Sequence, residues 1–75
     1  MTFKTQNLEA IAMNVRVARA RSGLTAIELS AKSGVCVATI SFIENAKKEV
    51  RVSTLQRLAE ALGVPLEELL SHPSV

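Results

Sequence analysis

The feature that most constrains this chain is the connection between two short segments with helical spacing of apolar residues. One segment begins at about Thr25 and ends near Ser33, and the next begins near Cys36, so that Gly34 and Val35 alone join them. A connection this short, with a glycine free to adopt a positive φ, forces two helices to cross steeply. Val35 is then expected to point into the core between them. Because ordinary helical hairpins have loops of similar length, the spacing alone leaves both interpretations open.

The rest of the chain also has apolar residues at helical spacing, with interruptions at glycines. Thr25 and Glu28, and likewise Ser53 and Gln56, have the spacing of a capping box, which starts a helix. The helices expected from these signals cover about residues 7–22, 25–33, 36–44, 53–62 and 65–71, and a tail at 71–75 is expected to fray. No linker divides the 75 residues, so we predict one all-α domain over residues 1–75, a compact five-helix bundle.

Composition excludes several classes of protein. A single cysteine, Cys36, cannot form a disulfide within the chain, and Cys36 with His72 cannot complete a structural zinc site. The sequence therefore predicts no metal and no cofactor. No apolar run is long enough to span a membrane. The amino end, Met1 to Lys4, lacks the pattern of a signal peptide, so we expect a cytoplasmic protein.

No arrangement of residues predicts an enzyme. The adjacent acids Glu67 and Glu68 point to different sides of a helix and form no acid–base pair. Charge points elsewhere: residues 1–51 carry eight basic and four acidic side chains, whereas residues 52–75 carry one and three. This asymmetry favours a face that meets a polyanion, although solvated helix faces produce the same pattern.

The order of residue types resembles a known family. Residues 23–35 read GLTAIELSAKSGV, residues 39–45 read TISFIEN and residues 55–64 read LQRLAEALGV. This pattern resembles the phage-repressor (Cro-type, XRE) helix-turn-helix family, over roughly residues 15–70. The resemblance implies a lambda-repressor-like DNA-binding domain, with the helix-turn-helix at about residues 25–44 and its third helix in the major groove.

The resemblance also implies which residues read bases. The family's base-contacting positions correspond here to Val37, Ala38, Ser41 and Phe42, with Thr39 nearby. Three of the first four are apolar and cannot form the bidentate hydrogen bonds that distinguish guanine or adenine, although they can contact a thymine methyl. Direct readout is therefore expected to be thin, with readout of DNA shape supplementing it.

Phosphate contacts are implied on both sides of the third helix. At the start of the second helix, Ala26 replaces the family's usual Gln, which leaves backbone amides to hold a phosphate there. Ala46 likewise replaces the usual Gly of the loop after the third helix. The residues implied in phosphate contact are Arg16, Thr25, Ala26, Asn45, Lys47, Lys48 and Arg51.

A further pair is implied to have an orienting role. The family pairs the positions of Arg19 and Glu44 in an ion pair that ties the first helix to the end of the third. Its expected effect is on the geometry of the third helix more than on net stability, since desolvation offsets the Coulombic gain. Cys36 opens the third helix, where its thiol either replaces a capping hydroxyl or acts as a redox sensor.

The sequence thus predicts a sequence-specific transcriptional regulator that binds double-stranded DNA as a homodimer on a pseudo-palindromic operator. The dimer contact is expected to use some of Val50, Val52, Leu66 and Leu70, with Leu69 inside the domain. The alternative is a protein-interaction module with the same fold, antitoxin-like or partner-docking, because Ile27, Val37 and Phe42 are expected to be exposed. The resemblance leaves controller protein, antitoxin and phage-type regulator open.

Overall fold

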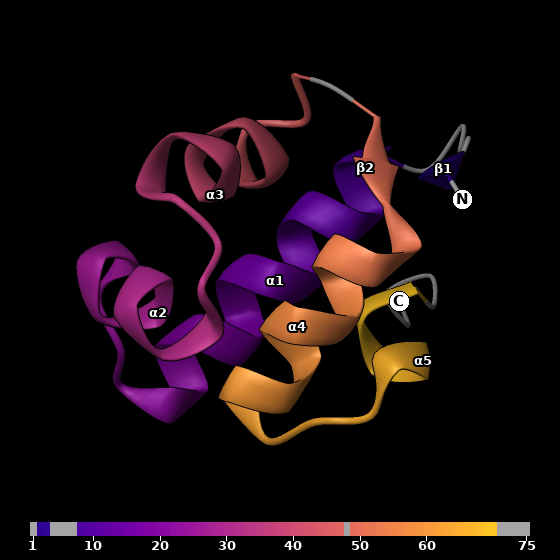
Figure 1. The fold of residues 1–75 in the computed structure, drawn as a ribbon. Helices are drawn as coiled ribbons and strands as arrows, with labels where there is room; N and C mark the ends of the chain where they lie inside the picture. The colour runs from indigo at the N-terminus through magenta and orange to yellow at the C-terminus, as the bar shows by residue number, and fades with distance from the viewer. Residues whose placement is uncertain (1, 4–7, 48, 71–75) are drawn as a thin grey trace.

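The structure, a computed structural model, describes residues 2–3, 8–47 and 49–70. In Figure 1, α1 runs through the molecule and packs against α3, α4 and α5, whereas α2 packs against α3 and α4. The elements are β1 (Thr2–Phe3), α1 (Leu8–Ser22), α2 (Ala26–Ser33), α3 (Val37–Glu44), β2 (Val50–Arg51), α4 (Val52–Leu62) and α5 (Leu66–Leu70). The predicted all-α, five-helix architecture is confirmed, and the ends of α2, α3 and α5 lie within one residue of the predicted ends.

The core lies between the five helices, with α1 packed against α3, α4 and α5, and α2 packed against α3 and α4. Each helix contributes the apolar stripe that its spacing predicts, and these side chains form one buried cluster. Asn14 ties the last helix to the first, because its Nδ2 donates a hydrogen bond to the carbonyl of Leu69 at 3.0 Å. The buried side chains of the cluster are Ile11, Val15, Ala18, Leu29, Val35, Ile40, Ile43, Val50, Leu55, Leu58, Ala59, Ala61, Leu62 and Leu69.

Two short strands were not predicted. β1 and β2 pair antiparallel, with Thr2 opposite Arg51 and Phe3 opposite Val50. Alternation explains β2, because Val50 is buried whereas Arg51 is exposed. The pairing also corrects the predicted start of α4. The backbone stays extended through Arg51 and becomes helical at Val52, so Ser53 lies inside the helix and the predicted capping box at Ser53 is wrong.

The predicted capping box of α2 is present. The side chain of Thr25 accepts from the backbone N–H of Glu28 at 3.0 Å, and Glu28 Oε1 accepts from the backbone N–H of Thr25 at 2.9 Å. Of the sequence predictions, those on Lys48 and on the tail at 71–75, His72 included, lie outside the described residues.

Candidate nucleic-acid interface

The turn between α2 and α3 has the predicted geometry. Gly34 ends α2 in the left-handed conformation (φ 78°), and its N–H donates to the carbonyl of Ser30 at 2.9 Å. Val35 follows and is buried, as predicted. The chain bends by 118° between the two helices, which is within the range of a helix-turn-helix motif and excludes an ordinary antiparallel hairpin.

One face of α3 is exposed, and it consists of Val37, Ala38, Ser41 and Phe42, here called the reading face. Val37 and Phe42 are each 40% exposed, whereas Ile40 and Ile43 on the opposite side are 0% and 4% exposed. The separation follows from the 100° rotation per residue of a helix. The placement of Phe42 away from the core is therefore confirmed, and Ser41 is the one polar residue of the reading face.

Thr39 and Cys36 lie at the start of α3, beside the reading face. Thr39 is half-buried, and its Oγ1 is 3.0 Å from the sulfur of Cys36. The thiol lies at the position of a capping residue without a capping hydrogen bond. The hydrogen bond with the Thr39 hydroxyl lowers the pKa of Cys36 from its ordinary value, because it stabilises the thiolate, and the backbone N–H groups of Thr39 and Ala38 contribute to lowering this pKa.

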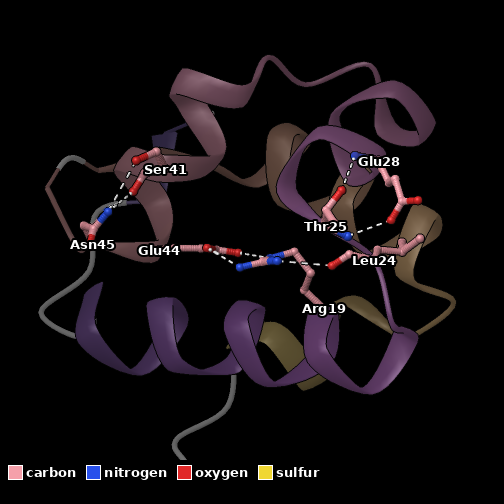
Figure 2. Close-up of polar contacts among 7 residues, drawn as sticks. All are labelled: Arg19, Leu24, Thr25, Glu28, Ser41, Glu44 and Asn45. Atoms are coloured by element: carbon pink, nitrogen blue, oxygen red, sulfur yellow. Dashed lines mark hydrogen bonds and ion pairs between the residues drawn. The ribbon is translucent and has the colours of Figure 1, made fainter.

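α3 is joined to α1 and to the start of α2 through Arg19. Its Nε and Nη2 donate to the two carboxylate oxygens of Glu44 at 2.7 and 3.0 Å, and its Nη1 donates to the carbonyl of Leu24 at 3.1 Å (Figure 2). The ion pair that the resemblance implies is therefore present in bidentate form. The hydrogen bonds with Glu44 raise the pKa of Arg19 above its ordinary value. A planar guanidinium held at three points fixes the position of α3 relative to α1.

The structure brings together two of the implied phosphate contacts that are far apart in the chain. Arg16 on α1 and Asn45 after α3 line one hollow of about 360 Å³, beside Met13 and Ala46. Lys47 is exposed immediately after it. The sequence separation of these positions is about thirty residues, so only packing of α1 against α3 places them side by side.

The turn after α3 keeps the shape that a glycine would give it. Ala46 adopts a left-handed conformation (φ 55°). The N–H of Lys47 donates to the carbonyl of Phe42 at 2.9 Å, and that of Ala46 donates to the carbonyl of Ile43 at 3.1 Å. These two bonds form a Schellman motif, which ends many helices. Ala46 therefore adopts the conformation that glycine favours at this position of the motif.

The other implied phosphate contacts lie at two separate places. Thr25 caps α2 and Ala26 is its first residue. In Figure 2, Thr25 lies across Arg19 from Asn45. The exposed Arg51 lines a second hollow, of about 260 Å³, between α3 and the start of α4, together with Thr39 and Phe42.

The residues implied in dimerisation divide into two groups. Val50 is 4% exposed and belongs to the core, which leaves it little surface for a second copy. Val52, Leu66 and Leu70 are half-buried, and Leu69 is fully buried, as predicted. In Figure 1, α5 and the start of α4 lie on the side of the molecule away from α2.

Two features of this region were missed by sequence reasoning. The hollow that joins Arg16 and Asn45 has no local sequence signal. The hydrogen bonds from the Asn45 amide to Ser41 do have one, because residues four apart lie on the same face of a helical turn. Within the described ranges there is no cluster of side chains able to hold a metal ion, and no single helix there is long and apolar enough to cross a membrane.

This geometry defines a helix-turn-helix domain, and residues 15–69 match the helix-turn-helix family HTH_3. The chain belongs to this family of DNA-binding transcriptional regulators.

Three known proteins illustrate the likeness. The HTH-type transcriptional repressor RghR of Bacillus subtilis is 41% identical over 64 residues, which are 84% of this chain and 47% of RghR. This chain therefore spans about half the length of RghR. The hypothetical transcription factor NHTF from Neisseria has 30% identity and a TM-score of 0.82, over 97% of this chain and 85% of NHTF. The restriction-modification controller protein C.AhdI from Aeromonas hydrophila has 25% identity and a TM-score of 0.81, over 87% of this chain and 98% of C.AhdI.

Proposed function

We propose that this chain binds double-stranded DNA sequence-specifically as a homodimer, on a pseudo-palindromic operator, and thereby regulates transcription. The observation that carries the proposal is the exposed reading face of α3, held in place by Arg19 and flanked at both ends by candidate phosphate contacts. Binding of one domain to one half-site is weak and unspecific. A two-fold dimer contacts two half-sites at once, which raises both affinity and specificity.

The reading face enters the major groove in this proposal. Val37, Ala38 and Phe42 contact thymine methyl groups, Ser41 forms a polar base contact, and Thr39 lies at the edge of the contact. One polar residue specifies few bases, so the deformability of the operator supplies part of the specificity. The residues proposed to hold phosphates are Arg16, Thr25, Ala26, Asn45, Lys47, Lys48 and Arg51.

A second candidate function is docking of a protein partner on the same face. It is favoured by the apolar side chains exposed there and nearby, because Ile27 is 72% exposed and Val37 and Phe42 are each 40% exposed. The basic residues around α3 favour DNA over this alternative, because they attract phosphates, whereas an apolar partner surface offers them no opposite charge.

Binding of random duplex DNA over a series of salt concentrations distinguishes the two functions. We expect log Kd to change linearly with log salt concentration, because phosphate contacts release counterions. Lys47→Ala and Lys48→Ala should each flatten the slope by about one and weaken all sequences about equally. Arg57→Ala, an exposed α4 residue with the same charge change, is the matched control and should leave the slope unchanged. A slope near zero, or no binding, would favour protein docking.

A further inference from the structure

The side-chain amide of Asn45 is bonded to the one polar residue of the reading face. Its Nδ2 donates to the backbone carbonyl of Ser41 at 2.8 Å and to the Ser41 hydroxyl oxygen at 3.4 Å (Figure 2). Asn45 follows the last residue of α3 and lies one turn beyond Ser41. The contact therefore connects the end of α3 with the middle of its reading face.

The Ser41 backbone carbonyl fixes the orientation of the Asn45 side-chain amide. A backbone carbonyl only accepts hydrogen bonds, so the NH₂ group of Asn45 must face it, and the amide oxygen must point elsewhere. The Ser41 hydroxyl oxygen beside that carbonyl is consequently an acceptor toward Asn45. A hydroxyl has one proton and two lone pairs, and Asn45 occupies one lone pair. Among the described residues, none accepts the Ser41 proton.

We propose that Asn45 is a positioning residue that makes Ser41 a hydrogen-bond donor toward DNA, with the N7 atom of a purine as its acceptor. The inference rests on the proposed function. Contact with the groove removes water, and a hydroxyl proton left there without an acceptor costs free energy. Every base pair presents a purine N7 in the major groove, whereas the other acceptors, guanine O6 and thymine O4, and the amine donors differ from pair to pair. Ser41 thereby disfavours cytosine, whose major-groove edge offers only an amine donor, on the strand that it faces.

Changing Asn45 to Asp should turn the Ser41 hydroxyl from a hydrogen-bond donor into an acceptor toward the base. A carboxylate only accepts, so it turns away from the Ser41 carbonyl and directs an oxygen at the Ser41 hydroxyl, which donates its proton to it and leaves its lone pairs directed at the base. Asn45→Asp should therefore shift the preferred contact from N7 to an exocyclic amine, N6 of adenine or N4 of cytosine. A merely structural role of Asn45 would weaken binding without changing the preferred base.

The test begins with a duplex selected from a random library by the unaltered protein. Its purines are replaced one at a time with 7-deaza analogues, which lack N7, and its adenines with purine base, which lacks the N6 amine. At one position or more, the 7-deaza analogue should weaken binding about three- to tenfold, the contribution of one hydrogen bond. This penalty should vanish in Ser41→Ala and fall in Asn45→Ala. Lys47→Ala is the matched control, and it should weaken every duplex while keeping the penalty.

The outcomes separate this inference from the proposed function. A selected duplex that shows no 7-deaza penalty dependent on Ser41 and Asn45 would overturn the inference and leave DNA binding intact. A Ser41-dependent penalty on removing the N6 amine in the unaltered protein would also overturn it. A new selection with Asn45→Asp should give adenine or cytosine contacts at the affected position, and an unchanged preference would contradict the reversal. If no duplex is selected at all, the inference and the function both fail.

Discussion

At the scale of single residues, the turn after α3 depends on an alanine in a conformation that favours glycine. Ala46 has a φ of 55°, and the Schellman hydrogen bonds of Ala46 and Lys47 hold it there. A left-handed conformation costs an L-residue about 1–2 kcal/mol, because its Cβ approaches the following carbonyl. The two Schellman hydrogen bonds offset part of this cost.

Ala46→Gly should therefore stabilise the protein. Relief of the left-handed strain exceeds the greater unfolded-chain entropy of glycine, and we expect a gain of about 0.5–1 kcal/mol in the free energy of unfolding. Urea denaturation measures it. Ala20→Gly, an exposed position inside α1, is the control and should lose about 1 kcal/mol. An Ala46→Gly variant that is no more stable than the original chain would show that the left-handed conformation of Ala46 carries no strain.

The thiol of Cys36 should react at lower pH than an ordinary cysteine. Its pKa is lowered from an ordinary value of 9.0, first by the hydrogen bond with the Thr39 hydroxyl. A lowered pKa means that the thiolate, the reactive form, is present below the usual pH range. The rate of iodoacetamide alkylation against pH should have its midpoint below that of a model thiol, and Thr39→Val should move the midpoint up. A midpoint unchanged in Thr39→Val would assign the shift to another cause.

Phe42 separates the two candidate functions. Phe42→Ala should leave the fold intact, since Ile40 and Ile43 hold α3 in the core. If α3 reads DNA, binding to the selected site should weaken by about 1–3 kcal/mol while binding to random DNA hardly changes, because only base contact is lost. Titration of both duplexes measures this. If the face docks a protein, DNA binding should be unchanged and a partner complex lost. An unfolded variant would contradict the placement of Phe42.

At the scale of secondary-structure elements, the position of α3 depends on a contact with α1. Arg19 holds Glu44 in a bidentate ion pair and also binds the carbonyl of Leu24, so one side chain connects α1, the start of α2 and the end of α3. Pairing of two partly desolvated charges adds little net stability compared with an apolar pair of the same size. Its larger effect is to give α3 a single orientation.

Removing one member of this pair should therefore cost more than removing both. Glu44→Met should lower the free energy of unfolding by about 2 kcal/mol, because Arg19 keeps its charge without its partner. The double variant Arg19→Met with Glu44→Met should recover much of this loss and still bind the selected duplex poorly, because α3 is no longer oriented. Urea denaturation and duplex titration measure the two effects. A double variant that binds DNA normally would show that the Arg19–Glu44 pair is not needed to orient α3.

At the scale of the whole molecule, three half-buried apolar side chains lie on α5 and at the start of α4. Leu69 is fully buried in the core, whereas Val52, Leu66 and Leu70 are half-buried. In Figure 1, α5 and the start of α4 lie on the side of the molecule away from α2. A contact there between two copies leaves the start of the helix-turn-helix uncovered in both.

Sedimentation should accordingly show a dimer at high micromolar concentration without DNA. Leu70→Lys should give a folded monomer, because a charge at the two-fold contact is repelled by its symmetry mate. Met13→Lys, at a side chain 49% exposed on α1, is the matched control and should stay dimeric. An unaltered chain that sediments only as a monomer would rule out a stable dimer through this surface.

Local chemistry was enough to predict the helices and their buried faces. The capping box of Thr25 and Glu28 lies within one turn, and Gly34 ends α2 through its own backbone freedom. Ile40 and Ile43 point inward because of helical periodicity alone, which also places Phe42 outside. Each of these outcomes depends on residues no more than a few positions apart, so the sequence by itself determined them.

Tertiary structure decided what depends on segments far apart in the chain. Val50 is buried and α4 begins at Val52 because β2 pairs with β1, about fifty residues earlier in the chain. Arg16 and Asn45 share a hollow because α1 packs against α3. Such contacts depend on the packing of complete elements, for which neighbouring residues along the chain carry no signal.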